Sequence, residues 1–366
     1  IGLLGICLII ATVLLGVHVA FAMITIGTFG LIMIIGPEPA LSSIALIVFS
    51  KTNSYDFAVV PLFLLMSAFV SRGGIAKDAF DTACAWVGHF KGGLAMATTV
   101  ACGFFAACGG SSLATAVAMG RMAYPEMKQY GYDSYLTAGT ISAGGTLGIL
   151  IPTSLGFILI GILTQLSIGK LFIAGIIPGI LQVAFYLCLI YFKCRINPDL
   201  GPALAKRSFT EKIGSLKLTW PMMLLFFTII GGIYGGLFTP TEAGAIGAFC
   251  ALLIGLIRRQ LGRSNLFECL LDTAKMTAMI MAMIIGAFIF NNFLAMTRIP
   301  FTTSEYVIGL GLSKYAVLII ILCGYLLLGT IFDVYAIIVL TVPIIYPTVV
   351  ALGFDPIWYG VLMVRV

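Results

Sequence analysis

The stretch CGGSSLATAVAMG at residues 108–120 decides the fold class. It lies between Lys91 and Arg121 in a run that has no charged side chain, yet its centre, Gly109-Gly110-Ser111-Ser112, consists of poor helix formers. As one straight helix this run would measure roughly 44 Å, against a hydrocarbon core of about 30 Å. We therefore predict that the chain turns back at these four residues, as a re-entrant hairpin over 91–127 with half-helices of about 22 Å.

Composition places this hairpin in a membrane. Of the 366 residues, 61% are hydrophobic and only 9% are charged, whereas a soluble domain carries about 25% charged residues. The apolar runs have the length of helices and lack the alternation of a barrel, so we predict an all-α integral membrane protein. The net charge of +6 does not indicate nucleic acid, because basic residues in membrane proteins usually mark cytoplasmic loops.

The sequence offers no convergent catalytic or transition-metal cluster. Only two histidines exist, His18 and His89, and the cysteines form no C-x-x-C pair. We predict that the protein is not an enzyme, and we assign His18 no role.

A second long uncharged segment, 134–169, contains GTISAGGTLGILIPTS at 139–154. Its length and its Gly and Pro residues predict a helix broken near the bilayer midplane. The alternative is tight packing of small residues between straight helices.

Basic segments orient the chain. Residues 193–217 hold six Lys or Arg and residues 258–263 hold three more, so both segments are predicted to be cytoplasmic. Counting spans from them places the N-terminus outside and opens the first hairpin to the cytoplasm. In FTPTEAG, Thr239 and Glu242 form a predicted capping box, which makes Glu242 a helix cap rather than a proton carrier.

The chain contains an internal repeat. YPEMKQYGYD at 124–133 and YPTVVALGFD at 346–355 share Tyr, Pro, Gly and Asp at the same spacing. The second copy predicts a second re-entrant hairpin over 315–350 that opens to the outside, so the two halves form an inverted repeat, which is typical of secondary transporters. The predicted domains are scaffold spans at 1–71, a first transport unit at 72–192, a cytoplasmic loop at 193–217, scaffold spans and a linking helix at 218–296, and a second transport unit at 297–366.

The hairpin tips and broken helices are predicted to form the binding site. Helix ends, unwound carbonyls and hydroxyls supply hard oxygen ligands for Na⁺ and dipoles for an anionic substrate. Asp333 near the second tip is either a Na⁺ ligand or a helix cap. Arg365, inside a predicted span, meets a substrate carboxylate, pairs with an acidic residue or extends to the interface. The first half offers Ser111, Ser112, Thr115, Gly144, Gly145 and Thr146.

The stretches GGSSLATAVAMGRMAYPEMKQYGYD (109–133), AGGTLGILIPTS (143–154), SIGKLFIAGIIPG (167–179) and GGIYGGLFTPTEAGA (231–245) resemble the large membrane (M) subunit of tripartite ATP-independent periplasmic (TRAP) transporters. The resemblance implies an elevator-type carrier in the bacterial inner membrane, driven by a Na⁺ gradient. It implies uptake of an organic acid, such as a C4-dicarboxylate, keto acid or sugar acid. It also implies a periplasmic substrate-binding (P) protein and a small four-helix membrane (Q) subunit as partners, besides membrane lipids.

The resemblance also places the sites. It implies a first Na⁺ site at Gly109, Gly110, Ser111, Ser112, Gly144, Gly145 and Thr146, and a second at Gly329, Thr330 and Asp333. We expect substrate contacts at Ser112, Thr115, Pro152, Thr153 and Arg365. The chain ends where the second counterpart of GTLGILIPTS should begin, so we expect it to be C-terminally incomplete. The alternative function is a Na⁺/dicarboxylate symporter of similar hairpin architecture that needs no binding protein.

Overall fold

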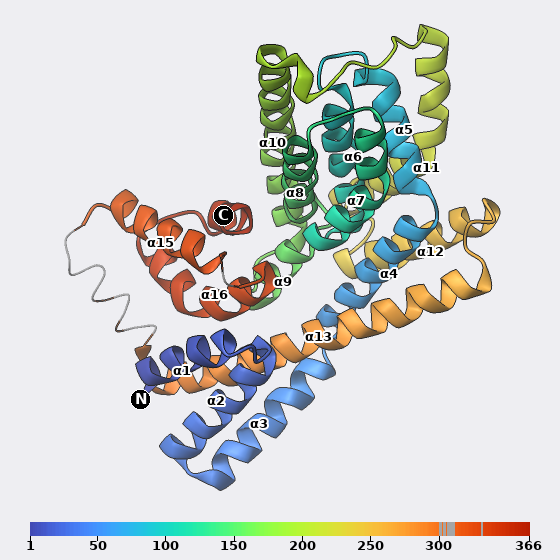
Figure 1. Ribbon diagram of the computed structural model, residues 1–366. Helices are drawn as coiled ribbons and strands as arrows, with labels where there is room; N and C mark the ends of the chain where they lie inside the picture. The colour runs from blue at the N-terminus through green and yellow to red at the C-terminus, as the bar shows by residue number, and fades with distance from the viewer. Residues whose placement is uncertain (300–301, 303–304, 306–311, 331) are drawn as a thin grey trace. The chain divides into compact units, whose positions relative to one another are not determined.

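The computed structural model describes residues 1–299, 302, 305, 312–330 and 332–366, and every regular element in these residues is a helix (Figure 1). The all-α prediction is confirmed, while part of the predicted second transport unit lies outside the described residues. In chain order the elements are α1 (Gly2–Leu14), α2 (Val19–Ile35), α3 (Pro37–Thr52), η1 (Tyr55–Ala58), α4 (Val59–Arg72), α5 (Ile75–Val87), α6 (Gly93–Gly109), α7 (Ser112–Gln129), α8 (Ser134–Leu150), α9 (Leu155–Thr164), α10 (Ile168–Ile196), η2 (Pro198–Leu200), α11 (Phe209–Tyr234), α12 (Pro240–Ile257), α13 (Arg263–Met296), α15 (Lys314–Leu328), α16 (Val334–Ala351) and α17 (Pro356–Arg365).

The helices have the length and composition of a multi-pass membrane protein. Among the described residues, seven helical stretches are long and apolar enough to cross a membrane, counting α8 and α9 together across their break. The predicted capping box at the start of α12 is confirmed: the Thr239 hydroxyl accepts from the Glu242 amide at 3.3 Å, and the Glu242 carboxylate accepts from the Thr239 amide at 2.8 Å.

The uncharged run around residue 110 is divided into two helices at the predicted place. Gly110, with φ of +61°, ends α6, and Ser111 begins α7 by accepting a hydrogen bond from the Ala114 amide at 3.4 Å. With 17 and 18 residues, the helices measure about 25 and 27 Å, longer than the predicted 22 Å. α6 is longer because the break lies beyond the middle of the uncharged run, and α7 is longer because it continues past Arg121 to Gln129.

The second segment divides into α8 and α9 at residues 151–154. Thr153 has φ of +78°, a conformation that is uncommon for a β-branched residue. The Ser154 hydroxyl accepts from the amides of Gly156 at 3.1 Å and Phe157 at 3.4 Å and so begins α9. Residues 151–154 are therefore a defined connection between two helices.

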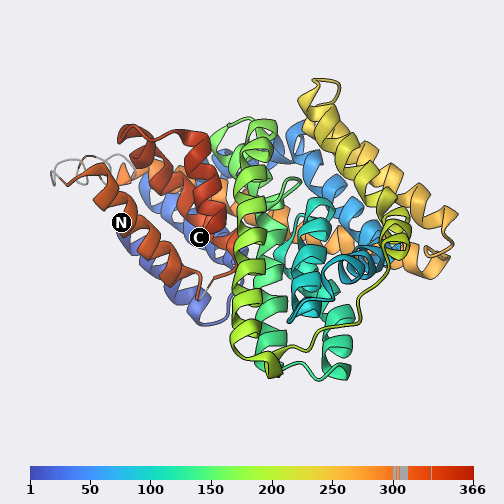
Figure 2. The same cartoon turned by 90° about the horizontal axis from the view of Figure 1, so that it is seen from above.

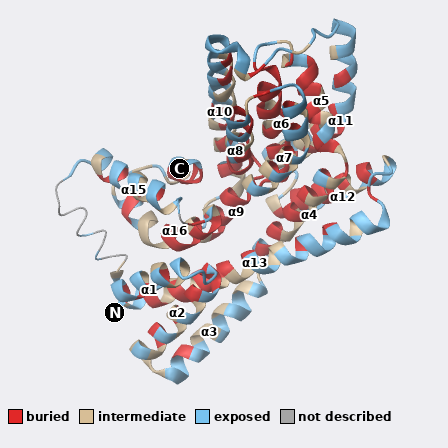
Figure 3. Cartoon of the chain, viewed as in Figure 1, coloured by how far each residue is buried: buried red, intermediate tan, exposed pale blue. Residues whose placement is uncertain are grey.

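The chain forms two compact units: residues 59–158 with 168–273, and residues 1–58 with 159–167 and 274–366. In the first unit α6 is central. It packs against α5, α7, α8 and α10, and 14 of its 17 residues are buried (Figures 1, 2 and 3). Helices α10 and α11 of the same unit carry many exposed apolar side chains, as expected of surfaces that face lipid.

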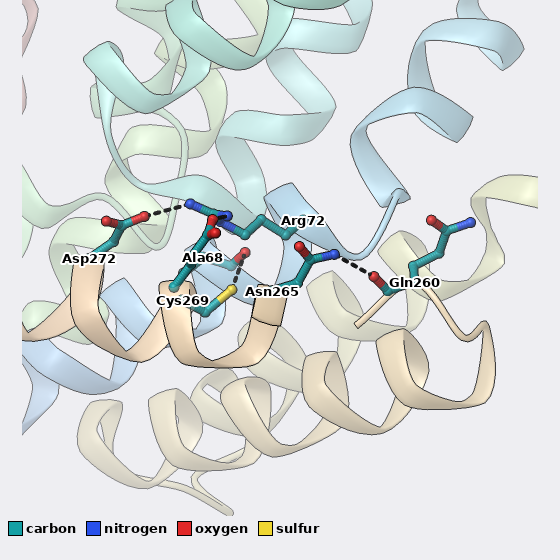
Figure 4. Close-up of polar contacts among 7 residues, drawn as sticks. Ala68, Arg72, Gln260, Asn265, Cys269 and Asp272 are labelled. Carbon is teal, nitrogen blue, oxygen red and sulfur yellow. Dashed lines mark hydrogen bonds and ion pairs between the residues drawn. The ribbon is translucent and has the colours of Figure 1, made fainter. Parts of the chain in front are cut away.

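Ion pairs join helices within this first unit. The Arg72 guanidinium at the end of α4 lies between Glu268 and Asp272, which are one turn apart on α13, and donates to Asp272 at 2.7 Å (Figure 4). Beside them the Cys269 thiol donates to the Ala68 carbonyl at 3.5 Å. Arg258, just after α12, pairs with Asp78 of α5. These contacts tie α4 to the start of α13, and α5 to the end of α12.

The second unit packs by the approach of small residues to aromatic rings. Gly5 of α1 and Gly30 of α2 both lie against the Phe293 ring of α13, where an added Cβ would come within 2.5 Å or less of ring atoms. The hydroxyls of Tyr325 and Tyr359 are 2.7 Å apart and join α15 to α17.

The internal repeat is visible in local structure. Helix α7 runs from 112 to 129 and α16 from 334 to 351, so both boundaries keep the offset that separates the two sequence motifs. Gly131 and Gly353 both have positive φ, +73° and +80°. Asp133 and Asp355 then cap the next helices with side-chain oxygens that each accept an amide at 2.8 Å.

Candidate functional site

The first hairpin tip and the broken helix meet. The Thr153 hydroxyl donates to the carbonyl oxygen of Ala107 at 2.9 Å, and the Leu155 amide donates to the carbonyl oxygen of Gly110 at 3.0 Å. These two bonds join the end of α6 to the connection between α8 and α9. They bring residues predicted from separate motifs into one place.

Glycines on α8 allow the tip to come close. A Cβ on Gly148 would lie 2.5 Å from the Ser111 carbonyl oxygen and 2.6 Å from the Thr115 hydroxyl oxygen. A Cβ on Gly145 would lie 3.2 Å from the Ser112 carbonyl oxygen. Gly144 faces α6 instead, where an added Cβ would lie 2.6 Å from the Cys102 sulfur. The small-residue motif therefore serves backbone contact between α7 and α8.

Four helix ends converge at this contact. α6 and α8 end here with carbonyl groups that lack intrahelical partners, and α7 and α9 begin here. The first amides of α9 are already bonded to the Gly110 carbonyl and the Ser154 hydroxyl. The ends of α6 and α8 carry partial negative charge and favour a cation, whereas the starts of α7 and α9 favour an anion. Ser111, Thr115 and Thr153 are buried here, and the Thr115 hydroxyl donates to the Ser111 carbonyl at 2.8 Å.

Besides Gly144, two more of the predicted residues of this half face elsewhere. Pro152 lines an apolar cavity of about 530 Å³ between α6, α10 and α11. The Thr146 hydroxyl faces α10, where it accepts from the Gln182 amide at 3.0 Å and lies 3.2 Å from the Tyr186 hydroxyl. Sequence reasoning missed Gln182, although a single amide within an apolar helix is a signal for such a polar contact.

The predicted residues of the second half lie around the start of α16. Gly329 ends α15, and the Thr330 hydroxyl donates to the Leu327 carbonyl at 2.7 Å. Asp333 accepts from the Tyr335 amide at 3.2 Å, so it caps α16 as one of the two alternatives predicted. Arg365 is exposed in the last turn of α17. Ile331, within this tip, lies outside the described residues.

Residues 200–202 of the basic segment lie across the end of the first hairpin that is opposite its tip, and we call them the strap. The buried Tyr132 hydroxyl donates to the Pro202 carbonyl at 2.7 Å and accepts from the Leu94 amide at 3.0 Å. Two backbone hydrogen bonds reach the same segment: the Asp133 amide donates to the Leu200 carbonyl at 3.0 Å, and the Gly92 amide donates to the Gly201 carbonyl at 2.8 Å. Burial raises the pKa of Tyr132 to about 12, which keeps this hydroxyl protonated. The start of α6 and the start of α8 are therefore held together at the end opposite the tip.

Comparison with known proteins extends over nearly the whole chain. The family model described as "Tripartite ATP-independent periplasmic transporter, DctM component" matches residues 6–366. The C4-dicarboxylate TRAP transporter large permease protein DctM of Pseudomonas aeruginosa is 38% identical over 334 residues, 91% of this chain and 78% of that protein. The isethionate TRAP transporter permease protein DctMQ of Oleidesulfovibrio alaskensis is 34% identical over 88% of this chain and 51% of that protein. The sialic acid TRAP transporter large permease protein SiaM of Vibrio cholerae is 31% identical over 85% of this chain and 73% of that protein.

Proposed function

The chain belongs to the family of TRAP transporter large permeases, and on this basis we propose that it couples Na⁺ entry to the uptake of an organic acid anion. The membership itself makes it a multi-pass membrane component of a secondary transporter that works with a substrate-binding protein. The proposal adds the coupling ion, the substrate class and the mechanism.

The substrate class rests on the relatives. Their names specify C4-dicarboxylate, isethionate and sialic acid, which are all acid anions at neutral pH. An anionic group needs amide donors or a cation at its site. The start of α7 offers such donors next to Ser112, Thr115 and Thr153. Pro152 is a further proposed substrate contact of this unit, and Arg365 is proposed as a separate contact on the second unit.

The observation that carries Na⁺ coupling is the convergence of the α6 and α8 C-terminal ends at Gly110 and Thr153. Two negative dipole ends with backbone carbonyls suit a hard monovalent cation. The proposed first site comprises Gly109–Ser112 with Gly144, Gly145 and Thr146, and the second comprises Gly329, Thr330 and Asp333. The internal repeat supports an inverted-repeat carrier that moves by an elevator mechanism with two re-entrant hairpins.

The partners are proposed from the same names. The relative called DctMQ is matched by this chain over 51% of its length, which leaves room in that protein for a second membrane component. We assign a small membrane (Q) subunit and a periplasmic (P) protein as partners, and the inner membrane as the location with the N-terminus in the periplasm.

Reconstitution tests the proposal. Purified permease with its small subunit is placed in proteoliposomes, and uptake of a labelled C4-dicarboxylate, sialic acid or isethionate is measured with and without the binding protein and with and without an inward Na⁺ gradient. We expect uptake only when both are present. Uptake that needs Na⁺ but no binding protein would favour the symporter alternative, and uptake that ignores Na⁺ would overturn the coupling.

A further inference from the structure

A groove of about 190 Å³ lies between α8 and α10 of the first unit, away from the hairpin tip. The two helices are neighbours in Figures 1 and 2 and run antiparallel: Asp133, before α8, bonds to Leu200, beyond α10, while Thr146 contacts Gln182. The wall of the groove is apolar at Gly139 and Leu189. One end carries Lys193 and Tyr135, both exposed.

The groove contains a buried polar atom that the protein does not satisfy. Thr140 is only 6% exposed, and within the described residues its hydroxyl has no hydrogen-bond partner. A buried unpaired hydroxyl costs about 1–3 kcal/mol, so a ligand that supplies an acceptor is favoured. Gly139, beside it, has no atom within 4 Å of the place a Cβ would take, which leaves the groove open at this level.

The depth of these groups matches one class of ligand. Since Thr146 lies opposite Gln182 and Tyr186, Thr140 lies roughly opposite Ile190, about 4–5 Å deeper than Lys193. Lys193 begins the basic segment that we assign to the cytoplasm, at the level where lipid headgroups lie. From this end inward the groove thus presents a cation, a hydroxyl donor and an apolar channel.

We propose that this groove binds an anionic phospholipid of the inner leaflet. The headgroup phosphate contacts the Lys193 ammonium, an ester carbonyl accepts from the Thr140 hydroxyl, and the upper part of one acyl chain lies over Gly139 and Leu189. The volume of about 190 Å³ fits part of one chain and not a protein helix. The polar contact of Thr146, Gln182 and Tyr186 closes the inner end.

Native mass spectrometry of the detergent-purified protein tests the site. The protein is titrated with phosphatidylglycerol or phosphatidylcholine of identical chains, and the bound fraction is measured. Wild type should prefer phosphatidylglycerol. Lys193→Gln should weaken that binding about fivefold and remove the preference, because one lysine near a charged headgroup contributes about that factor. Lys217→Gln, which removes a charge from the same basic segment away from the groove, should bind like wild type.

A second variant separates the effect of the open space in the groove from the effect of the Lys193 charge. Gly139→Leu places a bulky side chain where an added Cβ meets no atom within 4 Å, and it should weaken binding of both lipids equally. Binding that is the same in wild type, Lys193→Gln and Gly139→Leu would overturn the proposal. Displacement of phosphatidylglycerol by soluble glycerophosphate at equal concentration would also overturn it, since that result requires the headgroup alone.

Discussion

The Thr153 hydroxyl and the Ala107 carbonyl oxygen, 2.9 Å apart, join two motifs that are 46 residues apart in the chain. Both groups are buried, and Thr153 adopts φ of +78° to make the bond. A β-branched residue in this conformation is strained by about 1–3 kcal/mol, so the contact offsets a real cost. Thr153 therefore positions the hairpin tip, in addition to the substrate role proposed for it.

The pair Thr153→Val and Thr153→Ser tests this positioning. Valine keeps the shape and leaves the Ala107 carbonyl unpaired, which should lower the free energy of unfolding by about 1–3 kcal/mol. Serine keeps the hydroxyl and should unfold at or above the wild-type temperature in detergent. Equal unfolding temperatures for the two variants would show that the bond contributes nothing.

Gly148→Ala should be among the most damaging small substitutions in α8. The added methyl would lie 2.5 Å from the Ser111 carbonyl oxygen, and overpacking of this kind costs about 1–3 kcal/mol. We expect reduced uptake in proteoliposomes and a lower unfolding temperature. Gly139→Ala on the same helix meets nothing within 4 Å and serves as the control. A Gly148→Ala protein that unfolds and transports like the Gly139→Ala protein would contradict the close approach.

Much of the architecture followed from breakers placed in overlong apolar runs. Gly109–Ser112 were identified because length and composition agreed. The second break was predicted only within 139–154, and the structure places it at 151–154, while Gly144–Thr146 remain helical. The length of α7 was underestimated, since Met122–Gln129 carries Pro125 and the charged Glu126 and Lys128 yet remains helical. Asp133 and Asp355 each cap a helix through an amide three residues further along the chain. Because these contacts are local, the sequence repeat alone was sufficient to pair the two residues.

The site was only partly predictable because its contacts are distant in sequence. Tyr132 bonds to Pro202, 70 residues away, and Gln182 bonds to Thr146, 36 residues away. No local pattern specifies such pairs. The same limit applied to Thr146, whose motif indicates the tip while its hydroxyl faces α10.

Ser112 offers the cleaner test of Na⁺ binding at the tip. Ser111 caps α7, so Ser111→Ala should cost about 0.5–2 kcal/mol of stability whatever it does to ions. Ser112→Ala spares the cap and should raise the Na⁺ concentration for half-maximal uptake about tenfold, since losing one contact to a charged group costs about 1.5 kcal/mol. An unchanged Na⁺ dependence in both variants would remove this site.

Opposite orientation of the two repeats can be measured by labelling. Gly131 and Gly353 have positive φ, so cysteines are better placed at the exposed Gln129 and Ala351, which occupy equivalent positions. In a variant lacking the exposed native cysteines, an impermeant maleimide should label Gln129→Cys from the cytoplasmic side only and Ala351→Cys from the periplasmic side only. Labelling of both from one side would exclude an inverted repeat.

The Tyr132 strap should show a defined pH dependence. Tyr132→Phe removes the donor to Pro202 and leaves the Leu94 amide without its acceptor, which should cost about 1–3 kcal/mol at neutral pH. Burial raises the pKa of Tyr132 from its ordinary value of 10 to about 12, so the folded protein holds this proton more tightly than the unfolded chain does. The contribution of the Tyr132 hydroxyl to the free energy of unfolding is therefore complete below about pH 10 and is lost as the pH rises towards 12.

Unfolding temperatures at pH 7, 9 and 11 measure this dependence. The difference between wild type and Tyr132→Phe should be equal at pH 7 and 9 and smaller at pH 11, because only at the highest pH does the wild-type phenol begin to ionise on unfolding. Tyr130→Phe, at a neighbouring residue that is 51% exposed, controls for general effects of alkali. A difference that stays constant to pH 11 would show that the hydroxyl of Tyr132 is not buried against the strap.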